Sequence, residues 1–182
     1  MKALIVIDVQ NEFTEKGKRP VVDISDALEA IKMRVEQARK KDRPIAWIRH
    51  FNKPNESVAF VPHSWGSEFI RGFGPRQGSD KEIEMHKNVY GAFTGTEIEN
   101  WLKKVGANEV LIVGFYTHGC VSTTSREAIM AGLNVFIDPA ATGSCNMEHE
   151  ILGRLTAAEV KRSSLLHLAN MGAVITPLHE SV

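Results

Sequence analysis

The chain has 182 residues, of which 43% are hydrophobic and 24% charged, a composition typical of a globular domain and not of a disordered chain. Basic and acidic residues each number 22, so the formal net charge is zero. A nucleic-acid-binding protein is expected to carry a basic excess, and no apolar run approaches the roughly 20 residues of a membrane span. We therefore expect neither a nucleic-acid nor a membrane partner.

Six short segments along the chain, most of them apolar, predict β-strands. The first, ALIVI, is a continuous apolar run, which is typical of a strand that is covered on both faces. Strands are predicted at residues 3–7, 45–48, 81–87, 110–113, 134–137 and 173–176.

Amphipathic segments between the strands predict helices. Ser25 is the expected cap of the first helix, and Thr96 with Glu99 fits a capping box at the start of the second. Helices are predicted at residues 26–40, 96–106 and 120–131, with a long amphipathic pattern over 147–170 that is typical of a core helix or a subunit contact.

The alternation of strands and helices predicts a three-layer α/β/α sandwich with a parallel, Rossmann-like sheet. We expect one domain over residues 1–182. Residues 50–80 lose all periodicity and are rich in Gly and Pro, and an irregular loop of this length is usually a functional loop or lid.

Ligands of parallel sheets bind beyond the carboxyl ends of the strands. The first strand is followed by Asp8-Val9-Gln10-Asn11, which lacks the Gly-rich turn that a dinucleotide needs, and the P-loop pattern is also missing. We therefore expect no nucleotide and no other cofactor.

The strand ends instead offer an acid, an amine and a thiol. Asp8 closes the first strand, Lys87 ends the third, and Cys120 opens the helix after the VLIVG strand. A helix N-terminus and a nearby ammonium favour the thiolate, and a carboxylate can act as general base. Position alone favours a surface or capping acid, a solvated lysine and a buried cysteine over a catalytic group.

Three ordered segments, LIVIDVQNEF, HKNVYGAFTGTEIENWL and VLIVGFYTHGCVSTTSREAIMAGLNVFIDPAAT, resemble the isochorismatase-like cysteine hydrolases, the superfamily that includes nicotinamidases and carbamoylsarcosine amidases. The resemblance covers nearly the whole chain and implies a six-stranded parallel sheet. It implies that Asp8, Lys87 and Cys120 form a catalytic triad. It also implies a cis peptide at Phe115–Tyr116 that places the Tyr116 and Cys120 amides as the oxyanion hole.

The resemblance further implies an amidohydrolase that cleaves the C–N bond of a small amide, ureide or carbamoyl compound through a thioester. Isochorismate hydrolysis itself typically uses no cysteine nucleophile, so Cys120 argues against that reaction. One alternative is a non-catalytic small-molecule-binding or partner protein on the same scaffold. Another is a redox sensor, which would need Cys145 within bonding distance of Cys120, with a Cα separation below about 7 Å.

Nicotinamidases carry an acid and two or more histidines after the second strand to hold a metal. Here that acid is absent and only His50 and His63 remain, so we expect no metal and place the chain in the metal-independent branch of the superfamily. This makes nicotinamide an improbable substrate.

Several other residues are candidates for binding substrate. Phe13 matches the aromatic position of the family pattern DxQxxF, and we expect His118 to line the pocket, since two residues of spacing does not suit a Cys–His dyad. Trp65 and Tyr90 flank the catalytic segments, although core packing explains any one aromatic equally well. Arg71 and Arg76 can pair with a substrate carboxylate or lie solvated in the loop.

Location and assembly follow from composition and from the resemblance. Two cysteines cannot form a disulfide framework, and the N-terminal apolar run ends at Asp8, too early for a signal peptide. We therefore expect a cytoplasmic protein. Low net charge favours self-association, and relatives commonly form dimers or tetramers, so we expect a homo-oligomer.

Overall fold

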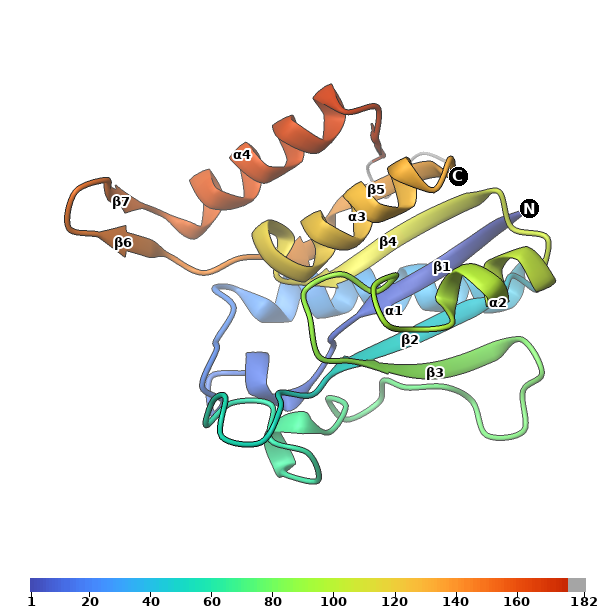
Figure 1. The fold of residues 1–182 in the computed structure, drawn as a ribbon, viewed down its shortest axis with the longest axis horizontal. Helices are drawn as coiled ribbons and strands as arrows, with labels where there is room; N and C mark the ends of the chain where they lie inside the picture. Colours follow the sequence, from blue (N-terminus) through green and yellow to red (C-terminus); the bar gives the residue numbers. More distant parts are fainter. Residues whose placement is uncertain (177–182) are drawn as a thin grey trace.

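A computed structural model describes residues 1–176 of the chain and contains a six-stranded parallel sheet in the order β3-β2-β1-β4-β5-β8. Its strands are β1 (Lys2–Ile7), β2 (Ile45–His50), β3 (Glu82–Lys87), β4 (Glu109–Phe115), β5 (Asn134–Gly143) and β8 (Val174–Ile175). Helices cover both faces of this sheet, which confirms the predicted α/β/α sandwich (Figure 1).

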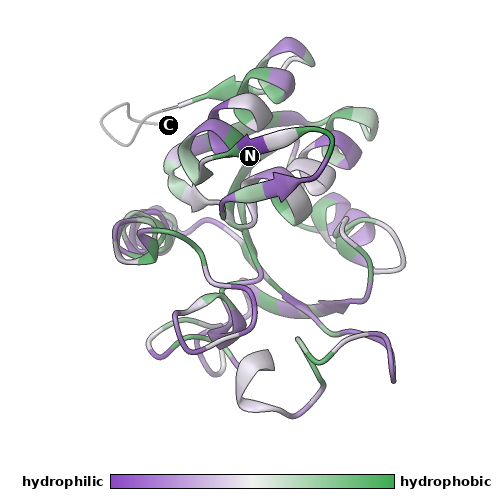
Figure 2. Cartoon of the chain, turned by 90° about the vertical axis from the view of Figure 1, so that its left-hand side faces the viewer, coloured by the Kyte–Doolittle hydropathy of each residue, from purple (hydrophilic) through white to green (hydrophobic). Residues whose placement is uncertain are grey.

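One helix covers the first face of the sheet and three cover the second. Helix α1 (Ile24–Lys40) lies on one side, and α2 (Ile98–Lys104), α3 (Ser122–Met130) and α4 (Ala157–Asn170) lie on the other (Figure 1). In Figure 2 the helices carry both hydrophobic and hydrophilic stretches, as expected for elements with only one face on a core. None of the helices in residues 1–176 combines the length and apolarity needed to cross a bilayer.

Strand β1 contributes to two hydrophobic cores, one on each face. Leu4 and Val6 pack in the cluster that contains Ile31 of α1, whereas Ile5 and Ile7 pack in the cluster on the opposite face. Successive side chains of a strand point to opposite faces, so a strand covered on both sides must be apolar throughout. This explains the unbroken ALIVI run.

A buried ion pair fixes α1 to the sheet. Arg34 Nε donates a hydrogen bond to Asp138 Oδ2 at 2.8 Å, and both side chains are at most 2% exposed. A buried pair of this kind is strongly destabilising to break, because the remaining partner becomes an uncompensated charge.

The expected starts of α1 and α2 were wrong. Helix α1 begins at Ile24 after Asp23, which has φ of 53°, so Ser25 lies in the first turn and is not the cap. Helix α2 begins at Ile98, and Glu97 precedes it without a side-chain cap. The Thr96 hydroxyl instead donates to Ala92 O and accepts from Ile98 N, so it stabilises the turn before the helix.

The long amphipathic pattern over 147–170 is not one helix. Its first part forms an antiparallel hairpin of β6 (Met147–His149) and β7 (Gly153–Leu155), which extends away from the sheet (Figure 1). Gly153 has φ of 78°, a conformation that interrupts a helix. A capping box between Thr156 and Glu159 then starts α4.

The segment between β2 and β3 is irregular and folds over the end of the sheet around a short 3₁₀ turn, Trp65–Ser67. Phe69 forms a bridge with Gln10, and Ile70 N donates to Val9 O at 3.0 Å. The loop therefore packs against the residues that follow β1 and helps to enclose the same end of the sheet.

The chain places β2 and β3 on one side of β1, and then β4, β5 and β8 on the other. Strand order therefore reverses between β1 and β4. Open parallel sheets bind ligands at the carboxyl ends of the strands at such a switch point.

Gly114 allows β1 and β4 to approach closely at this point. It has φ of 120°, and a Cβ atom there would lie 1.9 Å from Ile7 O. Gly132 also has positive φ, 81°, but has open space around it.

We expect Gly114→Ala to destabilise the fold by about 3 kcal/mol, from a disallowed backbone conformation plus a backbone clash, and Gly132→Ala by only about 1 kcal/mol. Urea unfolding measures both; equal losses would contradict this account.

Candidate active site

Asp8 is the first residue after β1, and the sheet itself fixes its backbone. Its N–H donates to Ile48 O at 2.9 Å, and its own carbonyl accepts from Gln10 N at 2.8 Å. Its φ of 53° turns the chain out of the strand, and its side chain is completely buried. A buried carboxylate needs a charged partner.

Lys87, the last residue of β3, is that partner. Its Nζ lies 2.7 Å from Asp8 Oδ2, 3.2 Å from Cys120 Sγ, 3.0 Å from His50 Nδ1 and 3.2 Å from Val89 O. An ammonium has three protons, so these four acceptors fully occupy it. The side chain is only 3% exposed.

Cys120 comes from the segment after β4. The chain makes a π-helical turn, Thr117–Val121, before α3, and Gly119 within it has non-helical φ and ψ of −112° and −107°. The cysteine is 8% exposed. The structure thus brings Asp8, Lys87 and Cys120, which are remote in sequence, into one cluster at the switch point.

The surroundings of Cys120 raise the pKa of its thiol. Burial and the neighbouring Asp8 carboxylate raise its pKa, and the opposing effect of the Lys87 ammonium is too small to compensate. Burial therefore outweighs the nearby ammonium, which by itself would favour the thiolate.

Lys87 is charged throughout the neutral range. Burial lowers its pKa, but Asp8 and then Cys120 raise it more, so the net shift is upward from the usual value. Because the ammonium holds its proton tightly, it acts as a fixed positive charge and not as an acid or base.

The peptide bond between Phe115 and Tyr116 is cis, as the resemblance implied. The Tyr116 carbonyl accepts from Gly119 N at 3.0 Å and from Val121 N at 3.1 Å, which holds the turn around Cys120. The Tyr116 hydroxyl donates to Pro20 O at 3.2 Å. The predicted oxyanion hole of the Tyr116 and Cys120 amides stays a prediction.

A pocket of about 880 Å³ opens at this cluster, with Asp8 and Cys120 in its wall. Three of the four substrate-binding candidates, Phe13, Tyr90 and His118, line it. Trp65 does not belong to its lining and is half exposed. The ring of His118 stacks on Tyr116, with centroids 4.8 Å apart, and its Nδ1 lies 3.2 Å from Ser144 Oγ.

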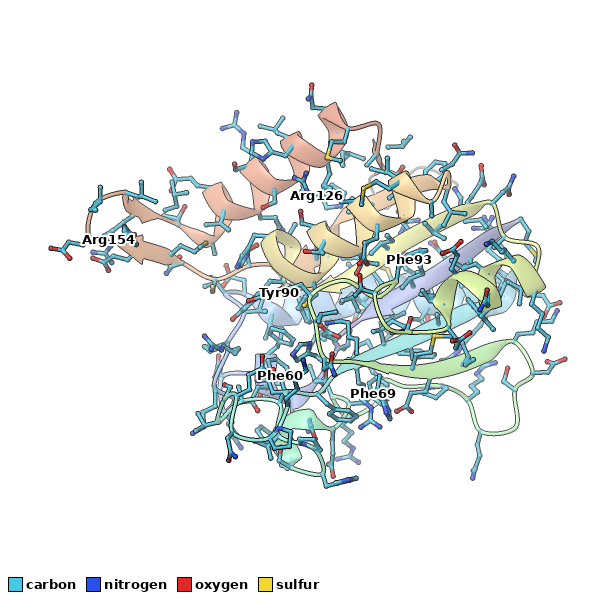
Figure 3. The ribbon with its side chains drawn as sticks, in the orientation of Figure 1. Phe60, Phe69, Tyr90, Phe93, Arg126 and Arg154 are labelled. Carbon is cyan, nitrogen blue, oxygen red and sulfur yellow. The ribbon has the colours of Figure 1, made fainter. Side chains whose placement is uncertain are left out.

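Sequence reasoning missed much of the pocket lining. Phe60, in the loop that follows β2, lines the pocket and was not among the candidates (Figure 3). The charged residue Arg19 also lines it, whereas Arg71 and Arg76 do not. Asn88 and Thr123 lie within the quoted motifs but were not singled out, whereas four further missed residues belong to no motif: Asn52, Glu56, Ser57 and Met147.

The donor set at the site does not fit a divalent metal. Atoms of Asp8, His50 and Cys120 lie within 4.8 Å of one another, but the Lys87 ammonium already contacts all three. His63 belongs to no such group of donors in residues 1–176. A second cation beside the ammonium would be repelled. The absence of a metal stays a prediction.

Comparison with known proteins shows the same scaffold. The isochorismatase domain matches residues 2–177. The chain belongs to the isochorismatase family, and this confirms the resemblance drawn from the three motifs. As a member of this family, the protein is a hydrolase.

Named relatives cover most of the chain. Nicotinamidase 3 of Arabidopsis thaliana is 32% identical over 160 residues, which span 81% of this chain and 76% of that protein. The nicotinamidase/pyrazinamidase of Mycobacterium tuberculosis is 30% identical over 181 residues, which span 88% of this chain and 97% of that protein. The crystal structure of an isochorismatase from Pseudomonas putida superposes with a TM-score of 0.88 at 28% identity and covers 97% of this chain and 87% of its own.

Removing one partner of the Asp8–Lys87 pair tests the electrostatic description. We expect Lys87→Met to destabilise the protein by about 3–5 kcal/mol, because it leaves the Asp8 carboxylate buried and unpaired. Adding Asp8→Asn should restore most of that stability.

The pKa of Lys87 in the folded protein lies above 10.5. The contribution of its charge to the free energy of unfolding is therefore complete below pH 10.5 and is lost only as pH rises further.

Urea unfolding at pH 7 measures these changes. The control is Lys103→Met, which removes the exposed Lys103–Glu99 pair and should change stability by less than about 1 kcal/mol. A Lys87→Met variant as stable as the wild type would contradict the buried charge pair.

Proposed function

We propose that the protein is a cysteine-dependent amidohydrolase that cleaves the C–N bond of a small amide, ureide or carbamoyl compound through a thioester. The observation that carries this proposal is the contact of the Lys87 ammonium with both Asp8 and Cys120 in the wall of a pocket. Membership of the isochorismatase family and relatives named as nicotinamidases support it.

Asp8 acts as the general base for the attack. Burial raises the pKa of the Cys120 thiol, so a base is needed, and its proton moves to the Asp8 carboxylate as the sulfur attacks the substrate carbonyl carbon. A C–S bond forms, and the carbonyl electron pair moves onto oxygen. The Tyr116 and Cys120 amides are proposed to donate hydrogen bonds to this oxyanion.

The intermediate then collapses. The oxygen electrons re-form the carbonyl, the C–N bond breaks, and the protonated Asp8 delivers its proton to the departing nitrogen. Ammonia or an amine leaves, and Cys120 is acylated. Water, deprotonated by Asp8, then attacks the thioester; the C–S bond breaks, the acid is released and the thiol regains its proton.

Lys87 stabilises each charged state without exchanging protons. Its ammonium lies 2.7 Å from the carboxylate and 3.2 Å from the sulfur, so it stabilises the negative charge on whichever group carries it. Its raised pKa keeps it charged while the proton moves between the other two groups.

The pocket supports a small substrate but does not define one. Its volume of about 880 Å³ is at the upper end of ordinary ligand pockets, and its lining mixes aromatic side chains with the opposite charges of Arg19 and Glu56. The relatives' names make nicotinamide a necessary member of any substrate panel.

We also propose that the protein is a cytoplasmic homo-oligomer, a dimer or a tetramer. Both cysteines are unpaired, which suits a reducing compartment. Ile151 and Leu152 at the tip of the β6–β7 hairpin are 84% and 83% exposed, and their burial against another copy would stabilise a hairpin that is marginal by itself.

A screen for ammonia release tests the function. We expect the native protein to release ammonia from at least one member of a panel of small amides, ureides and carbamoyl compounds. Cys120→Ala should lower turnover by at least about 10⁴-fold, since the nucleophile is lost. On rapid acid quench, mass spectrometry should show the substrate acyl group on Cys120 in the native protein.

Thermal unfolding of Cys120→Ala shows whether the variant is folded. Hydrolysis at the native rate by a folded Cys120→Ala protein would contradict the mechanism. Binding of panel compounds by the native protein, without turnover, would favour the non-catalytic binding protein.

A further inference from the structure

His50 is the last residue of β2, the strand between β1, which leads to Asp8, and β3, which ends at Lys87. Its Nε2 is 2.7 Å from Asn52 Oδ1, and its Nδ1 is 3.0 Å from Lys87 Nζ. The ring therefore makes one polar contact on each side, and the direction of each hydrogen bond follows from the groups around it.

The orientation of Asn52 determines the tautomer of His50. Asn52 Nδ2 donates to Ala59 O at 2.8 Å, and a carbonyl oxygen can only accept. The other atom of the amide is therefore the oxygen, so His50 Nε2 must carry the proton and donate to it. Nδ1 then has a free lone pair, which accepts a hydrogen bond from the Lys87 ammonium.

The backbone of His50 is held as firmly as its ring. Its N–H donates to Gln10 Oε1 at 2.8 Å, and Gln10 Nε2 donates to His50 O at 3.0 Å and to Ser67 O at 2.8 Å. The ring edge packs on Phe60, with centroids 5.2 Å apart. His50 is thus fixed to β1, to the loop after β2 and to the lysine.

Burial and the Lys87 ammonium favour the neutral form of the ring. Burial and then the Lys87 ammonium lower the pKa of His50, and these outweigh the opposite effects of Asp8 and of Glu56 in the loop after β2. A neutral ring can accept from an ammonium, whereas a protonated ring would repel it.

We propose that His50 is a positioning residue of the hydrolase: its Nδ1 accepts a hydrogen bond from Lys87 and holds the ammonium between Asp8 and Cys120. The inference rests on the proposed function for its catalytic meaning. A lysine side chain is flexible, and without this acceptor its ammonium can turn away from the sulfur.

Two substitutions separate the acceptor from the rest of the ring. In His50→Asn, the amide oxygen stands the same number of bonds from Cα as Nδ1 and can still accept from Lys87. In His50→Ala the acceptor is lost. His50→Gln retains bulk but places its polar atoms one bond further out, so it should behave as His50→Ala does, and it serves where the alanine variant fails to fold.

The first measurement requires no substrate. The rate of alkylation of Cys120 by iodoacetamide is followed against pH, with mass spectrometry of the peptide that contains Cys120. We expect His50→Ala to shift the alkylation profile upward by about one pH unit, because the thiolate loses stabilisation by a positioned ammonium. His50→Asn should retain the native profile.

Ammonia release then measures the effect on catalysis. We expect His50→Ala to lower kcat by about tenfold or more with little change in KM, and His50→Asn to recover most of the loss. The control is His86→Ala. The exposed ring of His86, on β3, contacts Glu84 away from the pocket, so this variant should keep the native alkylation profile and the native kcat.

A native alkylation profile in folded His50→Ala and His50→Gln would overturn the proposal. An equal upward shift in His50→Asn would also overturn it, since the ring would then act through its shape and not through its acceptor. If no amide is hydrolysed by the native protein, the proposed function fails, while the alkylation profiles still decide whether His50 positions Lys87.

Discussion

The ammonium of Lys87 is the charge on which the site depends. It contacts the Asp8 carboxylate, the Cys120 thiol and the His50 imidazole, and for the buried carboxylate it supplies the opposite charge that compensates for the loss of hydration. Its pKa is raised in spite of burial, so the fold stabilises the charged form of the lysine. One fixed positive charge can then stabilise negative charge on the carboxylate or on the sulfur as the proton passes between them.

The fold brings the acid, the amine and the thiol together. Asp8 follows β1, Lys87 ends β3 and Cys120 follows β4, so the parallel sheet places all three at one edge, and the reversal of strand order opens space between them. Gly114 permits the close approach of β4 to β1, and Gln10 joins the end of β1 to the end of β2. The same packing buries most of the Cys120 side chain, and this burial raises the pKa of its thiol.

The strands were predictable because both faces of the sheet are covered, which forces apolar runs such as ALIVI. The convergence of the acid, amine and thiol was not predictable from spacing, and only the resemblance to a family linked them. The hairpin at 147–155 was missed because its apolar residues also match helical spacing, and the decisive features are single residues, Gly153 and Thr156. No sequence pattern identifies Arg19 and Glu56 as residues of the pocket lining. The raised pKa of Cys120 depends on burial, which only the folded chain creates.

The most direct measurement of the central charge is an NMR titration of the lysine ammonium groups, with the Lys87 resonance assigned by its absence in Lys87→Met. The buried ion pair predicts a Lys87 signal that exchanges slowly with water and titrates above pH 10.5. A Lys87 ammonium that exchanges rapidly and titrates at or below pH 10.5 would show that it does not hold Asp8 and Cys120 as described.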